Sequence, residues 1–254
     1  MNTSGIVRIV RIVRIALSVV VVVSMSALVL LGLVVAPPDR FQGDAQRLMY
    51  LHVPAAWVAY LAFATTSLMS ALYLWHRTRR RRWDRLAAAS AELGVLFTVL
   101  TLALGSLWGR PVWGVWWTWD ARLITTTVLL FLYVGYLAIR RIPASEEVRA
   151  RRNAIAALVA FVDVPVVHFS VVWWRTLHQQ ATVVTPELDP QIEGAMAAAL
   201  LVGVLAFTAL FFRLLWARYE LAVHVDRLDA DVVADAVRRR RATATDSVLQ
   251  EVSA

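Results

Sequence analysis

The stretch IALSVVVVVSMSALVLLGLVV, residues 15–35, contains no charged side chain. The hydrocarbon core of a bilayer takes roughly 20 apolar residues of helix. The stretch therefore predicts a membrane-spanning helix, which we place at about residues 13–36. It is longer than the roughly 7–15 apolar residues of a signal-peptide core, and Pro37 and Pro38 follow it at once. We expect it to be retained.

Five more apolar stretches of similar length follow along the chain. Of the 254 residues, 59% are hydrophobic, and the mean hydropathy of +0.62 is too high for an ordinary soluble domain. We expect an all-α, polytopic membrane protein with six spans, at about residues 13–36, 53–75, 87–107, 123–140, 153–174 and 195–216. Residues 1–216 then form the membrane domain, and residues 217–254 form a cytoplasmic tail.

The arginines predict the orientation. All 26 basic residues are arginines. Of these, 21 lie in the N-terminal segment, the connections after the second and fourth spans, and the C-terminal end, and five lie in the other three connections. Because cytoplasmic segments are enriched in Arg and Lys, we expect both termini to be cytoplasmic. Connections 37–52, 108–122 and 175–194 then face outward. The net charge of +8 reflects this topology rather than nucleic-acid binding.

Two further features of composition bear on the chain. It has no cysteine, which excludes disulfides, thiolate ligands and thioether attachment of a cofactor to it. The C-terminal tail has apolar residues at helical spacing, which predict a surface helix: Leu221, Val225, Leu228 and Val232.

The segment WGRPVWGVWWTWD, residues 108–120, holds five of the 11 tryptophans. An aromatic belt should occupy both membrane interfaces, whereas this cluster lies on one side. The spacing of Trp113, Trp116 and Trp117 predicts one face of a short helix along the membrane surface. With Trp108 and Trp119, these rings predict a binding patch for a flat, apolar ligand such as a porphyrin or a quinone.

Smaller and charged residues accompany these rings. Gly109 and Gly114 would let a ligand approach the backbone closely. Asp120 either caps the helix of the fourth span or belongs to the site. Arg110 and Arg122 either pair with carboxylates of the ligand or extend to lipid headgroups.

Two histidines flank the tryptophan segment: His52 lies at the outer end of the second span, and His178 lies in the outer connection after the fifth span. His52 and His178 could approach a flat ligand from its two faces, as the axial ligands of haem iron do. Zinc is disfavoured because it usually takes three or four protein ligands. His168 shares the fifth span with Asp163 and is a candidate to support the ligands. His76 and His224 lie beside arginines, and we expect both to be surface residues.

The motifs resemble those of a known family. WGRPVWGVWWTWDARL resembles the WWD signature of haem-handling membrane proteins. LHVPAAW and HFSVVWWRTLHQ resemble the two histidine segments of the cytochrome c maturation protein C (CcmC) family. The resemblance is close over residues 40–180, and the six-span layout matches along nearly the whole length. The C-terminal tail is not part of the shared pattern.

The resemblance implies a site and a function. The WWD loop, residues 108–122, would hold haem b (iron protoporphyrin IX) at the outer face of the cytoplasmic (inner) membrane. His52 and His178 would ligate the iron. The haem would pass to a membrane-anchored periplasmic haem chaperone during c-type cytochrome biogenesis and become covalently attached there. A small single-span subunit and an ATP-binding cassette transporter would be partners.

The residues themselves predict no catalytic group. Any covalent attachment would rest on orienting the haem beside the chaperone's side chain, and the sequence has no phosphate-binding Gly-Lys-Ser/Thr loop. Other functions stay open. They are a haem- or quinone-dependent membrane redox carrier, the WWD subunit of the other cytochrome c synthesis system (generally a longer chain), a scaffold with an aromatic docking patch, and a transporter that carries haem across the bilayer.

Overall fold

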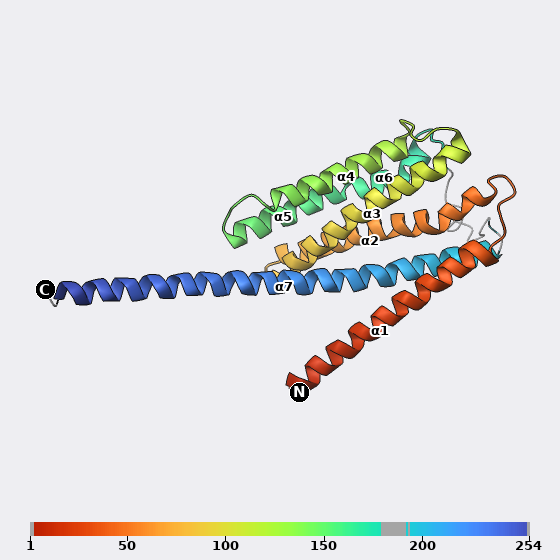
Figure 1. Ribbon diagram of the computed structural model, residues 1–254. Helices are drawn as coiled ribbons and strands as arrows, with labels where there is room; N and C mark the ends of the chain where they lie inside the picture. Colours follow the sequence, from red (N-terminus) through yellow and green to blue (C-terminus); the bar gives the residue numbers. More distant parts are fainter. Residues whose placement is uncertain (1–2, 179–191, 193, 253–254) are drawn as a thin grey trace. The chain divides into compact units, whose positions relative to one another are not determined.

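The structure, a computed structural model, describes residues 3–178, 192 and 194–252 (Figure 1). The described residues form helices, connections and one isolated β-bridge between Asp39 and Gly43. The helices are α1 (Thr3–Leu30) with a π-helical turn (Leu31–Val35), a 3-10 helix (Asp44–Leu48), α2 (Met49–Leu74), α3 (Arg81–Trp113), α4 (Ala121–Ile139), α5 (Glu146–Phe161), α6 (Asp163–Trp173) and α7 (Gly194–Val252). The predicted all-α fold is confirmed.

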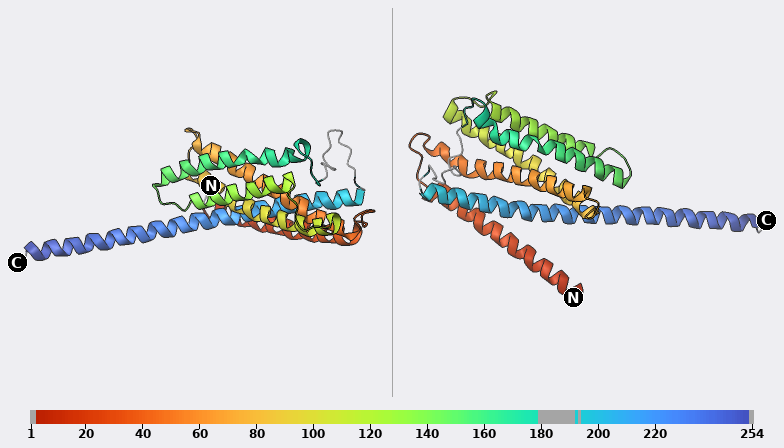
Figure 2. Two further views of the ribbon diagram at one scale, coloured as in Figure 1. Left: turned by 90° about the horizontal axis from the view of Figure 1, so that it is seen from above. Right: turned by 180° about the vertical axis from the view of Figure 1, so that it is seen from behind.

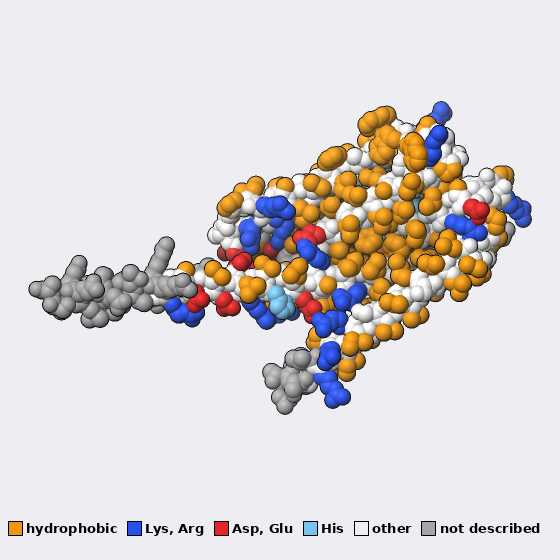
Figure 3. All heavy atoms as spheres, in the orientation of Figure 1, with side chains coloured by type: hydrophobic (Ala, Val, Ile, Leu, Met, Phe, Trp, Pro, Cys, Tyr) orange, Lys and Arg blue, Asp and Glu red, His pale blue; other side chains and the backbone are white. Residues whose placement is uncertain are grey.

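Six helical segments are long and apolar enough to cross a bilayer. They are Arg8–Val35, Asp44–Leu74, Arg81–Trp113, Ala121–Ile139, Glu146–Trp173 and Gly194–Ala236. Large apolar side chains point outward from them: Phe131, Val159 and Val172 are each about two-thirds exposed. Hydrophobic side chains cover this surface, and charged ones gather toward the ends of the helices (Figure 3). A multi-pass membrane protein with six spans is confirmed, because only lipid accepts so much exposed apolar surface.

The helices extend beyond the predicted spans. The third span, expected at 87–107, is helical from Arg81 to Trp113, and the helix expected at 195–216 continues to Val252. Hydrophobicity locates only the part of a helix inside lipid. The continuation of α7 is rich in Arg and Ala, which favour helix, whereas α3 continues through Gly109 and Pro111, which do not. One prediction is therefore wrong, because residues 108–113 are helical rather than part of a connection. His52 lies in the first turns of α2, which agrees with its predicted place at the end of the second span.

The fifth span is broken into two helices, whereas a single segment was expected at 153–174. α5 ends at Phe161 and α6 begins at Asp163. Pro165 explains the break, because it has no N–H to donate to the carbonyl of Phe161 and its ring crowds that carbonyl. The break gives α6 an end of its own close to α4.

α1 is the least buried of the six spans. Its N-terminal part diverges from α2 and α3, while its C-terminal end lies beside the start of α2 (Figures 1 and 2). Arg47 fixes that end, since its Nη1 donates to the carbonyls of Gly32 at 2.6 Å and Ala36 at 3.1 Å. These are carbonyls that a helix terminus leaves without partners.

Close packing joins the central helices at two glycines. Phe63 on α2 stacks on Tyr133 of α4, with ring centroids 3.7 Å apart. A Cβ on Gly94 of α3 would lie 2.3 Å from the Phe63 ring, so only glycine admits this stack. Gly203 of α7 allows a similar approach, because a Cβ there would lie 3.0 Å from the carbonyl oxygen of Tyr50.

A buried ion pair joins α3 and α4 at the end away from the tryptophan segment. Arg140 donates to both carboxylate oxygens of Asp84, at 2.7 and 2.9 Å, and to the hydroxyl of Tyr136 at 3.1 Å. The two charged side chains are only 16% and 14% exposed. The pair fixes the register of the two helices at the end away from residues 108–120.

The chain divides into two compact units, residues 1–215 and 216–254. The second unit is the continuation of α7, which confirms the predicted tail helix. Its apolar side chains are about half exposed or more: Leu221, Val225, Leu228 and Val232. Within it, Trp216 Nε1 donates to Glu220 at 2.8 Å.

Candidate functional site

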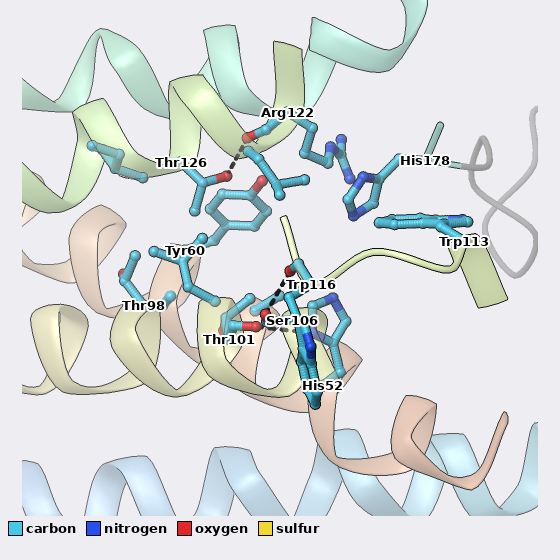
Figure 4. Close-up of a pocket in the computed structure, with 16 residues that line it drawn as sticks. His52, Tyr60, Thr98, Thr101, Ser106, Trp113, Trp116, Arg122, Thr126 and His178 are labelled. Atoms are coloured by element: carbon cyan, nitrogen blue, oxygen red, sulfur yellow. Dashed lines mark hydrogen bonds between the residues drawn. The ribbon is translucent and has the colours of Figure 1, made fainter. Parts of the chain in front are cut away.

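A pocket opens between α2, α3 and α4 at the tryptophan end of the spans. It encloses about 700 Å³ of space that no atom fills, part of it open to the outside. Its wall includes five of the residues predicted for the site: His52, Trp113, Trp116, Arg122 and His178. Figure 4 shows His52 and His178 on opposite sides of this space, with the two tryptophans beside them. Two histidines that lie 126 positions apart thus face one pocket.

His52 is held from several sides. Its Nδ1 lies 3.1 Å from the carbonyl oxygen of Thr101 on α3. A carbonyl only accepts, so Nδ1 carries the proton and Nε2 keeps its lone pair. The ring is edge-on to Trp108 with centroids 5.7 Å apart. A Cβ on Gly105 would lie 2.9 Å from His52 Cε1, so glycine makes room for the ring.

His178 lies in the non-helical segment that follows α6. Its ring packs edge-on against Trp113, with centroids 5.0 Å apart. Burial lowers the pKa of His178 to about 4, and the positive charge of Arg122 is the second largest cause. The carboxylate of Asp120 raises this pKa, but by less. The imidazole is therefore neutral at pH 7 and becomes charged only below about pH 4. The neutral ring is the form that ligates a metal.

Asp120 connects the tryptophan segment to the segment that carries His178. One carboxylate oxygen accepts from the backbone N–H of Arg122 at 2.9 Å, which confirms the predicted cap of the fourth span. The other accepts from the N–H of Leu177 at 2.7 Å. Burial alone would raise the pKa of Asp120, but hydrogen bonds from Thr176, Leu177 and Arg122 outweigh it and hold that pKa below its ordinary value.

The tryptophans do not form the predicted surface helix. α3 ends at Trp113, because Gly114 takes a left-handed conformation with φ of 78° and closes the helix. Residues 114–120 are irregular. The prediction that Trp113, Trp116 and Trp117 share one helical face is therefore wrong: Trp113 and Trp116 line the pocket, and Trp117 does not. Spacing predicts a shared face only where the helix continues, and glycine ends it here.

The other predicted aromatic and glycine residues lie around the pocket rather than in it. Trp108 packs on His52, and its Nε1 donates to Gln42 at 2.9 Å. Trp119 is 81% exposed. The space beside Gly109 is taken by Trp113, whose ring would lie 3.0 Å from an added Cβ. Gly114 has open space around it.

The two predicted arginines differ in their surroundings. Arg122 lines the pocket, and its Nη2 donates to the carbonyls of Val167 and His168 in α6, at 3.3 and 2.8 Å. Its Nε is buried and has no hydrogen-bond partner among the described residues. Arg110 is exposed and donates to the carbonyl of Gly114.

Sequence reasoning missed several residues of the pocket wall. Those with polar groups or a special packing role are Tyr60, Thr98, Thr101, Gly105 and Ser106. They lie on helices among many similar residues, so no local signal marks them.

His168 lies against Tyr60, with ring centroids 6.3 Å apart, and is not part of the wall. In the part of the chain that the structure describes, no group of three or more His, Cys, Asp or Glu could hold a metal ion. The outer connection predicted at 175–194 lies largely outside the described residues.

Comparison with known proteins gives the family. The pattern of the CcmC family, described as heme exporter protein C, matches residues 2–234. The chain belongs to this family. The match runs past residue 216, so the first part of the tail does belong to the shared pattern, contrary to expectation.

Named relatives agree with the family. "Heme exporter protein C" of Haemophilus influenzae is 35% identical over 75% of this chain and 76% of its own length. The protein of that name from Escherichia coli is 39% identical over 63% of this chain and 65% of its own, so the match spans slightly under two thirds of that relative. A putative cytochrome c biosynthesis ccmC-like mitochondrial protein of Arabidopsis thaliana is 39% identical over 60% of this chain and 57% of its own.

Proposed function

We propose that the protein binds haem in the pocket between His52 and His178 and delivers it to a partner during c-type cytochrome biogenesis. The placement of these two histidines on opposite sides of one pocket carries the proposal (Figure 4). The family supports it, because relatives carry the names heme exporter protein C and cytochrome c biosynthesis ccmC-like protein.

The residues of the pocket suit haem. His52 has Nε2 free, because Nδ1 faces the Thr101 carbonyl, and His178 is neutral at pH 7. Iron in haem takes two such ligands on opposite faces. Trp113 and Trp116 offer ring surface, and apolar burial supplies most of the affinity for a porphyrin. The chain has no cysteine, so haem b would be held without a thioether bond.

The arginines have different tasks in this proposal. Arg122 has a buried Nε without a partner in the described residues, and it lines the pocket, so it is the better candidate to pair with a haem propionate. Arg110 is exposed at the rim and already contacts its own helix end through Gly114. We propose a weaker and more solvent-screened role for it.

Location and partners follow from the topology and the family. We propose that the pocket lies on the outer, periplasmic face of the inner membrane with both termini cytoplasmic, and the arginine distribution supports this orientation. At that face the pocket is open to a membrane-anchored haem chaperone. A small single-span subunit and an ATP-binding cassette transporter complete the proposed assembly. The protein acts as a holder and donor of haem, and no residue is assigned a catalytic role.

A visible absorption spectrum tests haem binding directly. The protein purified in detergent, or given added haem, is expected to show a Soret band and sharp bands after reduction. Leucine at both Trp113 and Trp116 should weaken haem affinity by about 2- to 12-fold for each ring. Trp75→Leu is the matched control, since Trp75 is exposed and does not line this pocket. A wild type that stays colourless with added haem contradicts the proposal.

Gly105→Ala tests whether the pocket needs the observed position of His52. The new Cβ would lie 2.9 Å from Cε1, so the ring must shift, and its hydrogen bond to Thr101 is expected to weaken. We expect haem affinity to fall by about 10- to 100-fold, as when an outer partner of a metal ligand is lost. Haem titration measures this. Gly135→Ala is the control, because a Cβ there meets nothing within 4 Å. Equal affinities in the two variants would show that the position of His52 does not matter.

A further inference from the structure

His52 and His178 differ in the contacts that hold their side chains in place. His52 stands on a helix of 26 residues that packs along α3. Three residues of α3 position its ring. The carbonyl of Thr101 lies at hydrogen-bond distance from Nδ1, Gly105 leaves room for the ring, and the ring of Trp108 packs against it in a T-shaped arrangement. Trp108 is itself tied to Gln42 at 2.9 Å. Turning this ring away from the pocket would break its contacts with Thr101 and Trp108 of α3.

His178 has few such contacts with the residues that the structure describes. It follows the end of α6 in irregular backbone, and its Nδ1 has no hydrogen-bond partner among the described residues. The nearest carboxylate oxygen, Oδ1 of Asp120, is 3.7 Å away, which is too long for a hydrogen bond. Its ring contact is with Trp113. Its own backbone N–H is satisfied locally by the Thr176 hydroxyl at 3.1 Å.

Asp120 is the residue that holds the His178 segment against the pocket. Its Oδ2 accepts from the N–H of Leu177 at 2.7 Å, and Thr176 also hydrogen-bonds to it. Its Oδ1 is committed to the N-terminus of α4 through Arg122. The segment is therefore fastened to α4 through one carboxylate. Segments held by few contacts open at low cost, whereas packed helices do not.

We propose that His178 is the axial ligand of the haem iron that exchanges first and His52 the one that releases the iron last, with Asp120 as the positioning residue that keeps His178 in place. This inference rests on the proposed function. Delivery then begins at the His178 side. The Fe–N bond to His178 breaks, the imidazole keeps its lone pair, and a neutral nitrogen donor of the partner protein fills the vacated position. One neutral donor replaces another, so neither the charge nor the oxidation state of the iron changes.

The first test compares single glycine variants of the two ligands. With His178→Gly, the haem should stay bound through His52, and millimolar imidazole should restore the six-coordinate spectrum. With His52→Gly, the haem should be lost during purification, and imidazole should not restore it. Equal retention and equal rescue in both variants, or the reverse order, would overturn the proposal. Size-exclusion profiles check that each variant is folded.

The second test needs no change at either histidine. Carbon monoxide binds reduced six-coordinate haem only after one axial ligand leaves, so its rate reports the release of the weaker one. Asp120→Asn replaces one acceptor oxygen with an amide and should speed carbon monoxide binding by about 10-fold or more. Asp163→Asn is the control, since Asp163 lies on α6 and does not line the pocket. An unchanged rate in Asp120→Asn would refute its positioning role.

The two proposals fail in different ways. A wild type that binds no haem under any condition removes the proposed function. A wild type with a normal six-coordinate spectrum, but with both histidines equally replaceable, leaves haem binding intact and removes only the asymmetry.

Discussion

Alanine at both His52 and His178 is expected to leave the purified protein without a Soret band. The two rings lie on opposite sides of one pocket, and each has a ring nitrogen available for iron. Removing both leaves only aromatic and apolar contacts with the porphyrin. The loss of affinity should exceed the roughly 10- to 100-fold that follows removal of an outer partner of a metal ligand. Haem titration followed by absorption spectroscopy measures it.

The matched control is alanine at both His76 and His224. These are the same residue type, and neither lines the pocket. His224 Nδ1 lies 2.7 Å from the Glu220 carbonyl of its own helix. This control should keep the haem content of the wild type. If the double variant at His52 and His178 retains its band, haem is held elsewhere. If the control loses its band as well, the loss has a cause other than ligation.

Arg140→Ala is expected to give the largest loss of stability among single substitutions. Arg140 makes two hydrogen bonds to Asp84 and one to Tyr136, in a site where both charged side chains are mostly buried. Its removal leaves a buried carboxylate without its partner, which costs about 3–5 kcal/mol. A lower thermal midpoint in detergent and a lower yield from membranes should follow.

Two comparisons isolate the ion pair. Arg141→Ala, at the exposed neighbouring position, should change the midpoint little. Alanine at both Asp84 and Arg140 should cost less than the sum of the two single changes, because no charge is then left unpaired. Additive losses would contradict a direct coupling between Asp84 and Arg140. Haem affinity of the folded fraction should be unchanged, since the pair lies at the opposite end of α3 and α4 from the pocket.

Much of the fold could be predicted because lipid imposes a simple rule on sequence. Each span must be apolar for roughly 20 residues, and stretches such as residues 15–35 meet that rule without reference to any other part of the chain. The Asp120 cap was predictable for the same reason, since a cap acts on its own helix. Helix ends outside lipid were not, because α3 continues to Trp113 despite Gly109 and Pro111, and Gly114 then stops it.

The candidate residues were predicted better than their geometry. His52 and His178 stood out as histidines beside a tryptophan cluster, and both line the pocket. The prediction that Trp113, Trp116 and Trp117 share one helical face was wrong, because Gly114 takes a left-handed conformation and ends the helix. Thr101 positions the His52 ring through its backbone carbonyl, and Gly105 makes room for that ring because it has no side chain. Neither role depends on a side chain that the sequence would reveal.

The sequence by itself determined the number of spans, the absence of cysteine chemistry and the types of residue available to bind a flat ligand. These depend on composition and local spacing. Only the tertiary structure decided that His52 is pinned by α3 while His178 depends on Asp120. That difference arises where α2, α3, α4 and the segment after α6 meet. Contacts between residues far apart in the chain depend on how the helices pack, and no single segment encodes that packing.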